Sequence, residues 1–403
     1  MITEDKKTEN AKIQIKNVKT AVGCRLSGLS VNSEECFFGD LFISRPPKKT
    51  LSPKDFVTFL GMNDISEHGD ILRQHSIRAS EVKAGLTAFE RSDILIAKIT
   101  PCFENGKGAC LDKLKTMVGF GSTEFHVLRA KPQVVPRYVY YHTRLLTFRM
   151  ELERKMIGSA GQKRVPMKAI ENYRIQVKHS YLEQQAIADV LSDIDSLVNN
   201  LDQLIAKKRN IKLAAMQQLL TGKQRLPGFS GEWKLKRFGD VLKVRHGKSQ
   251  KEVEVINGKY PILASGGEIG RTNDYLYDKP SVLIGRKGTI DSPQYTDNPF
   301  WTIDTLFFTE ISNSAFPKFI FYKFNMINWR IYCEASGVPS LNASTIEGIE
   351  FNTPSSLEEQ IAIAQVLTDM EIEILALEGQ CNKVRNLKQG MMQELLTGRI
   401  RLT

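Results

Sequence analysis

Two stretches of the chain combine residue types that could hold phosphates or the edges of nucleobases. Each is an apolar run of strand length that leads into a loop of glycine, polar and basic residues: ILIAKITPCFENGKGA at 94–109 and VLIGRKGTIDSP at 282–293. Such loops present backbone N–H groups and cationic side chains, which donate to phosphates and base edges. Any single residue of these loops could equally well be a solvated residue at the tip of a hairpin. The prediction of a binding loop therefore depends on the same layout occurring twice.

The candidate contacts lie in these two loops and in two further glycine-containing loops at 161–164 and 264–267, which carry less weight. Side chains that could donate to phosphates or bases define the set. The predicted binding residues are Lys98, Asn105, Lys107, Lys163, Arg164, Ser265, Arg286, Lys287 and Thr289.

Catalytic signatures are missing from the sequence. Residues 247–249 (Gly-Lys-Ser) resemble the end of a phosphate-binding loop, but Leu242 stands where that motif needs glycine. Neither a G-x-G-x-x-G dinucleotide motif nor a G-x-S-x-G nucleophile elbow occurs. Residues 81–83 (Glu-Val-Lys) with Asp70 weakly resemble a nuclease centre, although Glu-x-Lys is common by chance in a charged chain. We therefore predict no catalytic residue.

Metal-ligand spacing is missing as well. The six cysteines form no C-x-x-C pair, and the six histidines are isolated from them and from one another. We expect no metal site and reduced thiols in a cytoplasmic protein. The polar N-terminus lacks a signal-peptide core, and no apolar run reaches the roughly 18 residues of a membrane span.

The formal net charge is +11, in a chain that is 41% hydrophobic and 25% charged. This composition is typical of a globular protein. An excess of positive charge favours a polyanionic partner. A basic surface kept for solubility is the alternative that charge alone leaves open.

The chain repeats itself at an offset of 176 residues. Residues 183–226 and 359–402 align without a gap, and 21 of the 44 positions are identical. Solenoid repeats have periods of about 20–50 residues. The pattern therefore indicates a duplicated half-protein, in which a variable module and a long helix each occur twice. Two similar surfaces related by a rough two-fold axis suit duplex DNA, whose backbone is also two-fold symmetric.

The repeated segments have the apolar spacing of long helices. About 40 residues at 1.5 Å each would span roughly 60 Å. An apolar stripe of that length needs another helix to cover it. A helical hairpin within one core is possible, but the length and the duplication favour a coiled-coil spacer. The residues predicted to pack are Ile187, Val190, Ile194, Leu197, Leu201 and Leu204 in the first helix, and Ile363, Val366, Met370, Leu377, Val384 and Leu387 in the second.

Both helices end in Leu-Leu-Thr-Gly, with the glycines Gly222 and Gly398 as C-caps. The basic residues Lys223, Arg225, Arg399 and Arg401 follow, and we expect them to suit the helix C-terminal dipole. A turn-rich linker at 226–233 opens the second module. The predicted domains are a first module (1–180), a first helix (181–222), a second module (223–356) and a second helix (357–403).

Each module shows the same order of shorter elements. Strands are predicted at 93–99 and 124–130, and at 281–285 and 305–311. Helical patches are predicted at 137–156 and 318–332. The closing stretches keep the 176 offset, since Gly161 matches Gly337 and Ile170 matches Ile346.

With these motifs in place, the chain resembles the specificity subunit of a type I restriction–modification system. The resemblance covers nearly the whole sequence. It rests on the two E-Q-x-A-I-A-x-V-L-[ST]-D helix starts, the two L-L-T-G ends, YPILASGGEIG (260–270), VLIGRKGTI (282–290), IAKITPCFENGKGA and GVPSLNASTI (337–346).

The resemblance implies an α+β fold. Two α/β target recognition domains would each read one half of a bipartite DNA sequence, and two antiparallel helices would form a pseudo-two-fold coiled-coil spacer between them. It also implies partner subunits: modification subunits that transfer methyl groups from S-adenosylmethionine to adenine, and restriction subunits that use ATP and Mg. The chain itself would hold no cofactor and perform no catalysis. The two modules differ in sequence, so base contacts cannot be transferred between them, and the target sequence is not readable.

Two other functions compete with this one. A coiled-coil scaffold could join protein partners without DNA readout. A nuclease or methyltransferase acting alone is the other, and the lack of an Asn/Asp-Pro-Pro-Tyr/Phe motif argues against an adenine methyltransferase.

Overall fold

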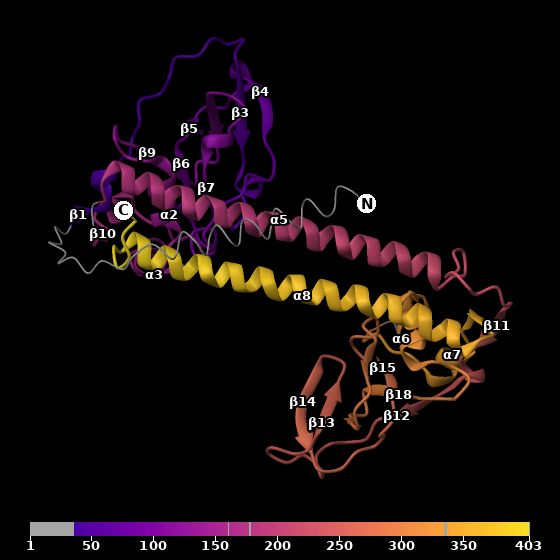
Figure 1. The fold of residues 1–403 in the computed structure, drawn as a ribbon. Helices are drawn as coiled ribbons and strands as arrows, with labels where there is room; N and C mark the ends of the chain where they lie inside the picture. Colours follow the sequence, from indigo (N-terminus) through magenta and orange to yellow (C-terminus); the bar gives the residue numbers. More distant parts are fainter. Residues whose placement is uncertain (1–35, 160, 177–178, 334–336, 403) are drawn as a thin grey trace. The chain divides into compact units, whose positions relative to one another are not determined.

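A computed structural model describes residues 36–159, 161–176, 179–333 and 337–402. The expected polar N-terminal tail lies outside these residues. The chain divides into two compact units (Figure 1): unit 1 comprises Met1–Leu201 and Gln380–Thr403, and unit 2 comprises Asp202–Gly379. Each unit mixes sheets and helices, as an α+β fold requires. Within the described residues, no helix combines the length and apolarity that crossing a membrane would require.

Unit 1 contains two four-stranded sheets. The first has the order β2-β9-β6-β7 and the second β4-β3-β8-β5, while β1 pairs with β10. The second sheet contains a parallel pair, β3 with β8. The strands are β1 (Cys36–Phe37), β2 (Phe42–Ile43), β3 (Phe56–Leu60), β4 (His75–Arg78), β5 (Thr87–Glu90), β6 (Ile94–Ala97), β7 (Gly108–Cys110), β8 (Val118–Gly121), β9 (Phe125–Ala130) and β10 (Arg174–Ile175).

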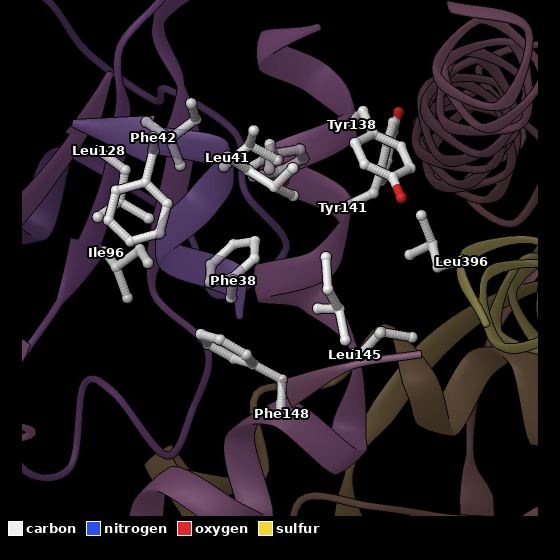
Figure 2. Packing of buried hydrophobic residues seen from close by; sticks show 14 of the residues in the cluster. Phe38, Leu41, Phe42, Ile96, Leu128, Tyr138, Tyr141, Leu145, Phe148 and Leu396 are labelled. Carbon is white, nitrogen blue, oxygen red and sulfur yellow. The ribbon is translucent and has the colours of Figure 1, made fainter. Parts of the chain in front are cut away.

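Three short helices complete the module of unit 1: α2 (Pro136–Arg144), α3 (Leu146–Glu153) and α4 (Met167–Glu171). The helical patch predicted at 137–156 is confirmed, and it forms two helices, α2 and α3. The backbone becomes extended at Leu145 (φ −61°, ψ 134°), so α2 ends there and α3 begins. Figure 2 shows the resulting core, in which Phe38 and Phe148 meet edge to face with ring centroids 5.4 Å apart.

Unit 2 follows the same plan with fewer strands. Its sheets are β12-β18-β15-β16, β14-β13-β17 and the pair β11-β19, and β13 runs parallel to β17. The module helices are α6 (Pro317–Asn325) and α7 (Ala343–Gly348). The strands are β11 (Trp233–Arg237), β12 (Leu242–His246), β13 (Tyr260–Ala264), β14 (Gly267–Thr272), β15 (Ser281–Gly285), β16 (Gln294–Thr296), β17 (Trp301–Thr302), β18 (Leu306–Ile311) and β19 (Glu350–Pro354).

Two long helices contribute residues to both units: α5 (Tyr181–Leu219) and α8 (Leu357–Leu396), which begin at the predicted residues. Within each unit, a piece of one helix packs antiparallel against a piece of the other, and both pieces join the core of the module. In unit 1, Ile187 and Leu191 of α5 share a cluster with Leu395 of α8. The helices end at Leu219 and Leu396, before the predicted segment ends at 222 and 403. The predicted cap glycines follow them, and Gly222 (φ +73°) and Gly398 (φ +72°) adopt the left-handed conformation that terminates a helix.

The predicted packing residues differ in burial. Ile187, Ile194, Leu197, Leu201 and Ile363 are buried, whereas Val190, Leu204, Val366, Met370, Leu377 and Val384 are half-buried. Leu387 is wrong as a packing residue, because 46% of its surface is exposed.

The buried stripe of α8 explains this error. It runs through Leu367, Ile374 and Cys381. Leu367 lies one position after Val366, the residue predicted to pack at that turn of the helix. Leu387 consequently falls on the flank of the helix. Its neighbour Lys388 faces α5 instead, where its ammonium pairs with Asp195.

Candidate nucleic-acid interface

The loop that follows β6 in unit 1 lies against a second loop far along the chain. The backbone N–H of Lys98 donates to the carbonyl of Glu124 (2.9 Å), and the carbonyl of Lys98 accepts from Val165 (2.9 Å). The N–H of Thr100 donates to the carbonyl of Lys163 (3.0 Å). Two predicted basic loops, 98–107 and 161–164, are thus brought together at the end of β6.

The loop that follows β15 in unit 2 repeats this arrangement. The N–H of Arg286 donates to the carbonyl of Thr305 (2.8 Å), and its carbonyl accepts from Leu341 (2.9 Å). The N–H of Gly288 donates to the carbonyl of Pro339 (2.9 Å). Leu341 and Pro339 are the 176-offset partners of Val165 and Lys163. The same pair of loops, joined by the same backbone bonds, therefore occurs once in each unit.

Only some of the predicted side chains of unit 1 are free to meet a ligand. Lys163 is exposed and Lys98 is half-exposed, and neither forms an ion pair within the described residues. Arg164 is paired instead: its guanidinium donates two hydrogen bonds of 3.0 Å to Glu124 and lowers the pKa of that carboxyl group. This pair partly neutralises the charge of Arg164.

Asn105 and Lys107 are engaged within unit 1. The Asn105 amide donates to Glu67 (2.8 Å), and the Lys107 ammonium donates to the carbonyl of Met62 (3.2 Å). Both partners lie in the 61–74 segment between β3 and β4. These two side chains hold that segment in place, so they are weaker candidates for contact than Lys98 and Lys163.

The candidates of unit 2 separate in a similar way. Lys287 and Thr289 are exposed at the loop tip, while Arg286 is half-buried and donates to the carbonyl of Asp304 (3.3 Å). Ser265 lies in another sheet, at the β13–β14 turn, where its carbonyl accepts from Gln294 (3.1 Å).

Two arginines that the sequence did not single out support the loop of unit 1. Arg144 donates to the carbonyls of Gly106 and Glu67, the latter at 2.6 Å. Arg149 donates to the carbonyl of Glu104 (3.3 Å). Each lies within a predicted helical patch that carries several charges, so nothing in the sequence distinguishes them from surface residues.

A buried carboxylate anchors each module to the helix pair. In unit 2, Arg225 donates two hydrogen bonds to Glu359, at 2.5 and 2.7 Å. In unit 1, Arg401 pairs with Glu183 in the same bidentate manner, with one bond of 2.6 Å. Each arginine also binds a carboxylate at the start of the other long helix, a contact that the expected interaction with the helix dipole does not include.

A second anchor joins a module tyrosine to both long helices. In unit 1, the Tyr141 hydroxyl donates to Asp195 of α5 (2.9 Å), and Lys388 of α8 pairs with the same carboxylate and lies 5.6 Å from the Tyr141 ring. In unit 2, Tyr322 donates to Glu371 (3.0 Å), and Lys212 pairs with Glu371 (3.1 Å) and lies 5.5 Å from the Tyr322 ring.

A signal for these anchors was present in the sequence. Four of the residue types are identical at the 176 offset, although they are polar and lie off the apolar stripe. The pairs are Glu183 and Glu359, Gln184 and Gln360, Lys212 and Lys388, and Arg225 and Arg401. Gln184 and Gln360 also act alike, since each accepts from a backbone N–H in front of α2 or α6, at 3.0 and 2.9 Å.

The described residues contain no group of three or more His, Cys, Asp or Glu side chains that could hold a metal ion. What the geometry offers is a pair of rigid, basic loop tips, each braced by backbone hydrogen bonds at the end of a buried strand. Such an arrangement can bind a polyanion.

Comparison with known proteins assigns a family to this chain. The family described as "Type I restriction modification DNA specificity domain" matches residues 31–209 and 230–385. These two matches contain the two modules and most of both long helices.

Two curated relatives come from Escherichia coli. The type I restriction enzyme EcoAI specificity subunit is 39% identical over 149 residues, which are 36% of this chain and 25% of the relative. The type I restriction enzyme EcoEI specificity subunit is 35% identical over 210 residues, which are 48% of this chain and 34% of the relative. The matched regions thus span between a quarter and about a third of these relatives.

Two solved structures share the fold at 16% identity. The type I restriction–modification S subunit from M. genitalium has a TM-score of 0.60, covering 92% of this chain and 98% of that chain. A chain from a structure of the type I R-M system, concerned with complex assembly and conformational transition, has a TM-score of 0.59, covering 93% and 100%. On the family match and this shared fold, the chain belongs to the type I restriction–modification DNA specificity domain family.

Proposed function

We propose that this chain is the specificity subunit of a type I restriction–modification enzyme and binds double-stranded DNA at a bipartite target. Unit 1 reads one half of the target and unit 2 reads the other. One observation carries this proposal: a pair of basic loops, joined by the same backbone hydrogen bonds, occurs once in each half of a duplicated chain. Family membership and the names of the relatives support it.

The physical mechanism follows from the loop chemistry. The half-exposed Lys98 and the exposed Lys163 and Lys287 neutralise phosphates and set the register of the protein on the duplex. A few neighbouring side chains then bond to base edges in the major groove. The net charge of +11 supplies the long-range attraction to DNA.

Catalysis in this proposal belongs to partner subunits. Modification subunits transfer methyl groups from S-adenosylmethionine to adenine, and restriction subunits use ATP and Mg for translocation and cleavage. This chain is non-catalytic and positions both kinds of subunit in the cytoplasm, where the DNA lies. Its two long helices act as the spacer that determines the gap between half-sites, about one helical turn of DNA or roughly 34 Å.

A salt titration tests DNA binding. We expect the logarithm of the affinity of the intact chain for random duplex to fall linearly with the logarithm of salt concentration. Replacing Lys98, Lys163 and Lys287 by Gln should reduce the slope by about 3, because each phosphate contact contributes close to 1. The matched control replaces Lys168, Lys234 and Lys236 by Gln.

The outcomes separate the proposal from its competitor. A flat salt response of the unmodified chain would support a coiled-coil scaffold without DNA readout. An equal loss of slope in both triple variants would mean that charge in general, rather than these loops, binds the duplex.

A further inference from the structure

Unit 2 contains a pocket between its two larger sheets, with a volume of about 510 Å³. Its lining includes the apolar side chains of Leu263 and Leu283. Its walls carry polar, basic and aromatic side chains: Lys259, Tyr260, Arg271, Gln294, Tyr295 and Asn298. None of the residues predicted to bind DNA lines it.

The corresponding space in unit 1 is closed. Leu263 of unit 2 corresponds to Leu60 of unit 1. The carbonyl of each leucine accepts a hydrogen bond from the residue that follows the parallel neighbouring strand, Ile303 for Leu263 and Ser122 for Leu60. Leu283 pairs with Gln294 across β15 and β16, and Leu95 pairs with Ala109 across β6 and β7. In unit 1, Leu60, Leu95 and Ala109 are wholly buried in one apolar cluster.

The length of the β-hairpin connection explains this difference. Between β3 and β4, residues 61–74 contribute Met62, Ile65 and Ile71 to the cluster that seals unit 1. Between β13 and β14 only Ser265 and Gly266 intervene, so this connection is too short to cover the pocket of unit 2. The two units therefore have one framework, with the space filled in unit 1 and open in unit 2.

Gln294 lines the pocket and is held by two hydrogen bonds. Its amide nitrogen donates to the carbonyls of Ala264 (2.9 Å) and Ser265 (3.1 Å). Since both of those groups are acceptors, the Gln294 carbonyl oxygen is left to accept a bond from a ligand, and no donor to it is found among the described residues. An acceptor in that position favours adenine or cytosine, which present an exocyclic amine in the major groove, over guanine or thymine.

The rim of the pocket supplies two cations. Lys259 lies 5.1 Å from the Tyr260 ring, and Arg271 pairs with Glu268 (2.9 Å). Both partners of the second pair are 46% exposed, and an exposed ion pair of this kind adds little stability. A phosphate can therefore replace Glu268 as the partner of Arg271.

We propose that the pocket is a base-reading subsite of unit 2, which receives the edge of one DNA strand and has no counterpart in unit 1. Lys259 and Arg271 contact phosphates, and the Gln294 oxygen accepts from the exocyclic amine of adenine or cytosine. The pocket is far too small for a whole duplex, so only part of a strand enters it. This inference rests on the proposed DNA-binding function.

The first test measures phosphate contact with the intact chain and random duplex. Replacing Lys259 and Arg271 by Gln should lower the salt slope by about 2. Removing the competing carboxylate with Glu268→Gln should tighten binding. The control replaces Lys234 and Lys236, on β11, by Gln and should leave the slope closer to that of the unmodified chain.

The second test selects bound sequences from a randomised duplex library. Gln294→Met keeps the size of the side chain and removes its acceptor, so we expect a preference for adenine or cytosine of about tenfold or more to disappear at one position of one half-site. A merely structural role would instead weaken the whole half-site.

Each outcome decides between the two proposals. If the unmodified chain selects no sequence, the proposed function fails. If it selects a bipartite sequence and the pocket variants behave like the control, the function stands and the subsite is rejected. Free nucleotides carry the same phosphates, so binding of ATP alone is also measured. If ATP binds the unmodified chain but not the Lys259/Arg271 variant, while both bind duplex with the same salt slope, the pocket is assigned to nucleotides and the inference is overturned.

Discussion

The two units differ in the space between their sheets and agree where the long helices meet the modules. Glu183 with Arg401 and Glu359 with Arg225 are the same contact made twice. By contrast, Ala109 and Gln294 occupy the same register position on their strands, yet one is sealed in a core and the other lines a pocket.

This comparison separates two kinds of constraint on one framework. The anchors are polar contacts that involve both long helices, so a change on one helix leaves a partner unsatisfied on the other or in the module. The space between the sheets is less constrained, because a longer hairpin connection can fill it without disturbing the strand register. Duplication followed by change at such positions would yield two modules that dock alike and recognise different ligands.

The largest expected effect comes from exchanging residues 228–356 for the corresponding residues of a relative. Because each unit makes its own loop pair and its own anchors, the exchange should replace one half-site completely and leave the other unchanged. Mapping methylated adenines in cells that carry each version measures this result. Changes in both halves would contradict independent recognition by the two units.

The next effect concerns the gap between half-sites. Removing one helical turn from both α5 and α8, at positions matched by the 176 offset, shortens each helix by about 5.4 Å. We expect both half-sites to keep their sequences while the unread gap between them changes. The same methylation map provides the measurement, and removal of a turn from α5 alone is the control, since it should disrupt helix pairing. A new half-site sequence would count against a spacer role.

Much of the fold was predictable because the repeat and the apolar spacing are strong signals. The starts of both long helices, the C-caps Gly222 and Gly398, and the central strands of each module follow from periodicity and from glycine placement. These features depend on local sequence, which a single chain displays directly.

Features that depend on contacts distant in sequence were not predictable. Arg225 and Arg401 bind carboxylates that lie 134 and 218 residues away. Their identity at the 176 offset marks them as unusual, but no local pattern indicates which carboxylate each one binds. The pocket depends on how long the β13–β14 connection is relative to β3–β4, which requires the strand register of both units. Leu387 was misplaced because Lys388 can bury its alkyl chain and keep its charge paired.

A smaller effect tests whether the two anchors are equivalent. Glu359→Ala removes a carboxylate that is 1% exposed and accepts from Arg225 and from Trp233 (3.3 Å), so we expect the free energy of unfolding to fall by about 2–3 kcal/mol. Glu183→Ala in unit 1 should cost somewhat less, because no tryptophan donor supports it. Urea unfolding measures both, with the exposed neighbour Glu358→Ala as control. Equal losses of unfolding free energy in Glu358→Ala and Glu359→Ala would show that the buried Glu359–Arg225 pair contributes no stability of its own.

The smallest effect concerns one position that differs between the units. His142 on α2 corresponds to Lys323 on α6, six residues after the proline that opens each helix. Burial lowers the pKa of His142 to about 3 and the pKa of Lys323 to about 7. Below pH 6.5 the unfolded chain therefore binds a proton at position 142 that the folded chain does not, and stability falls as the pH falls. Between pH 7 and about 10.4 the unfolded chain binds a proton at Lys323 that the folded chain has released. Stability therefore rises with pH in that range.

We expect the His142 contribution to change the free energy of unfolding by at most about 1.4 kcal/mol per pH unit between pH 6.5 and 5. His142→Leu should remove this part of the pH dependence, since the ring is wholly buried against Phe38 and Tyr138 and has no hydrogen-bond partner among the described residues. Urea unfolding at several pH values gives the slope, and His68→Leu, which changes an exposed histidine of the same unit, is the control. If the slope of unfolding free energy against pH is unchanged in His142→Leu, the His142 ring takes up its proton without unfolding. Position 142 of unit 1 would then tolerate charge as well as Lys323 does in unit 2.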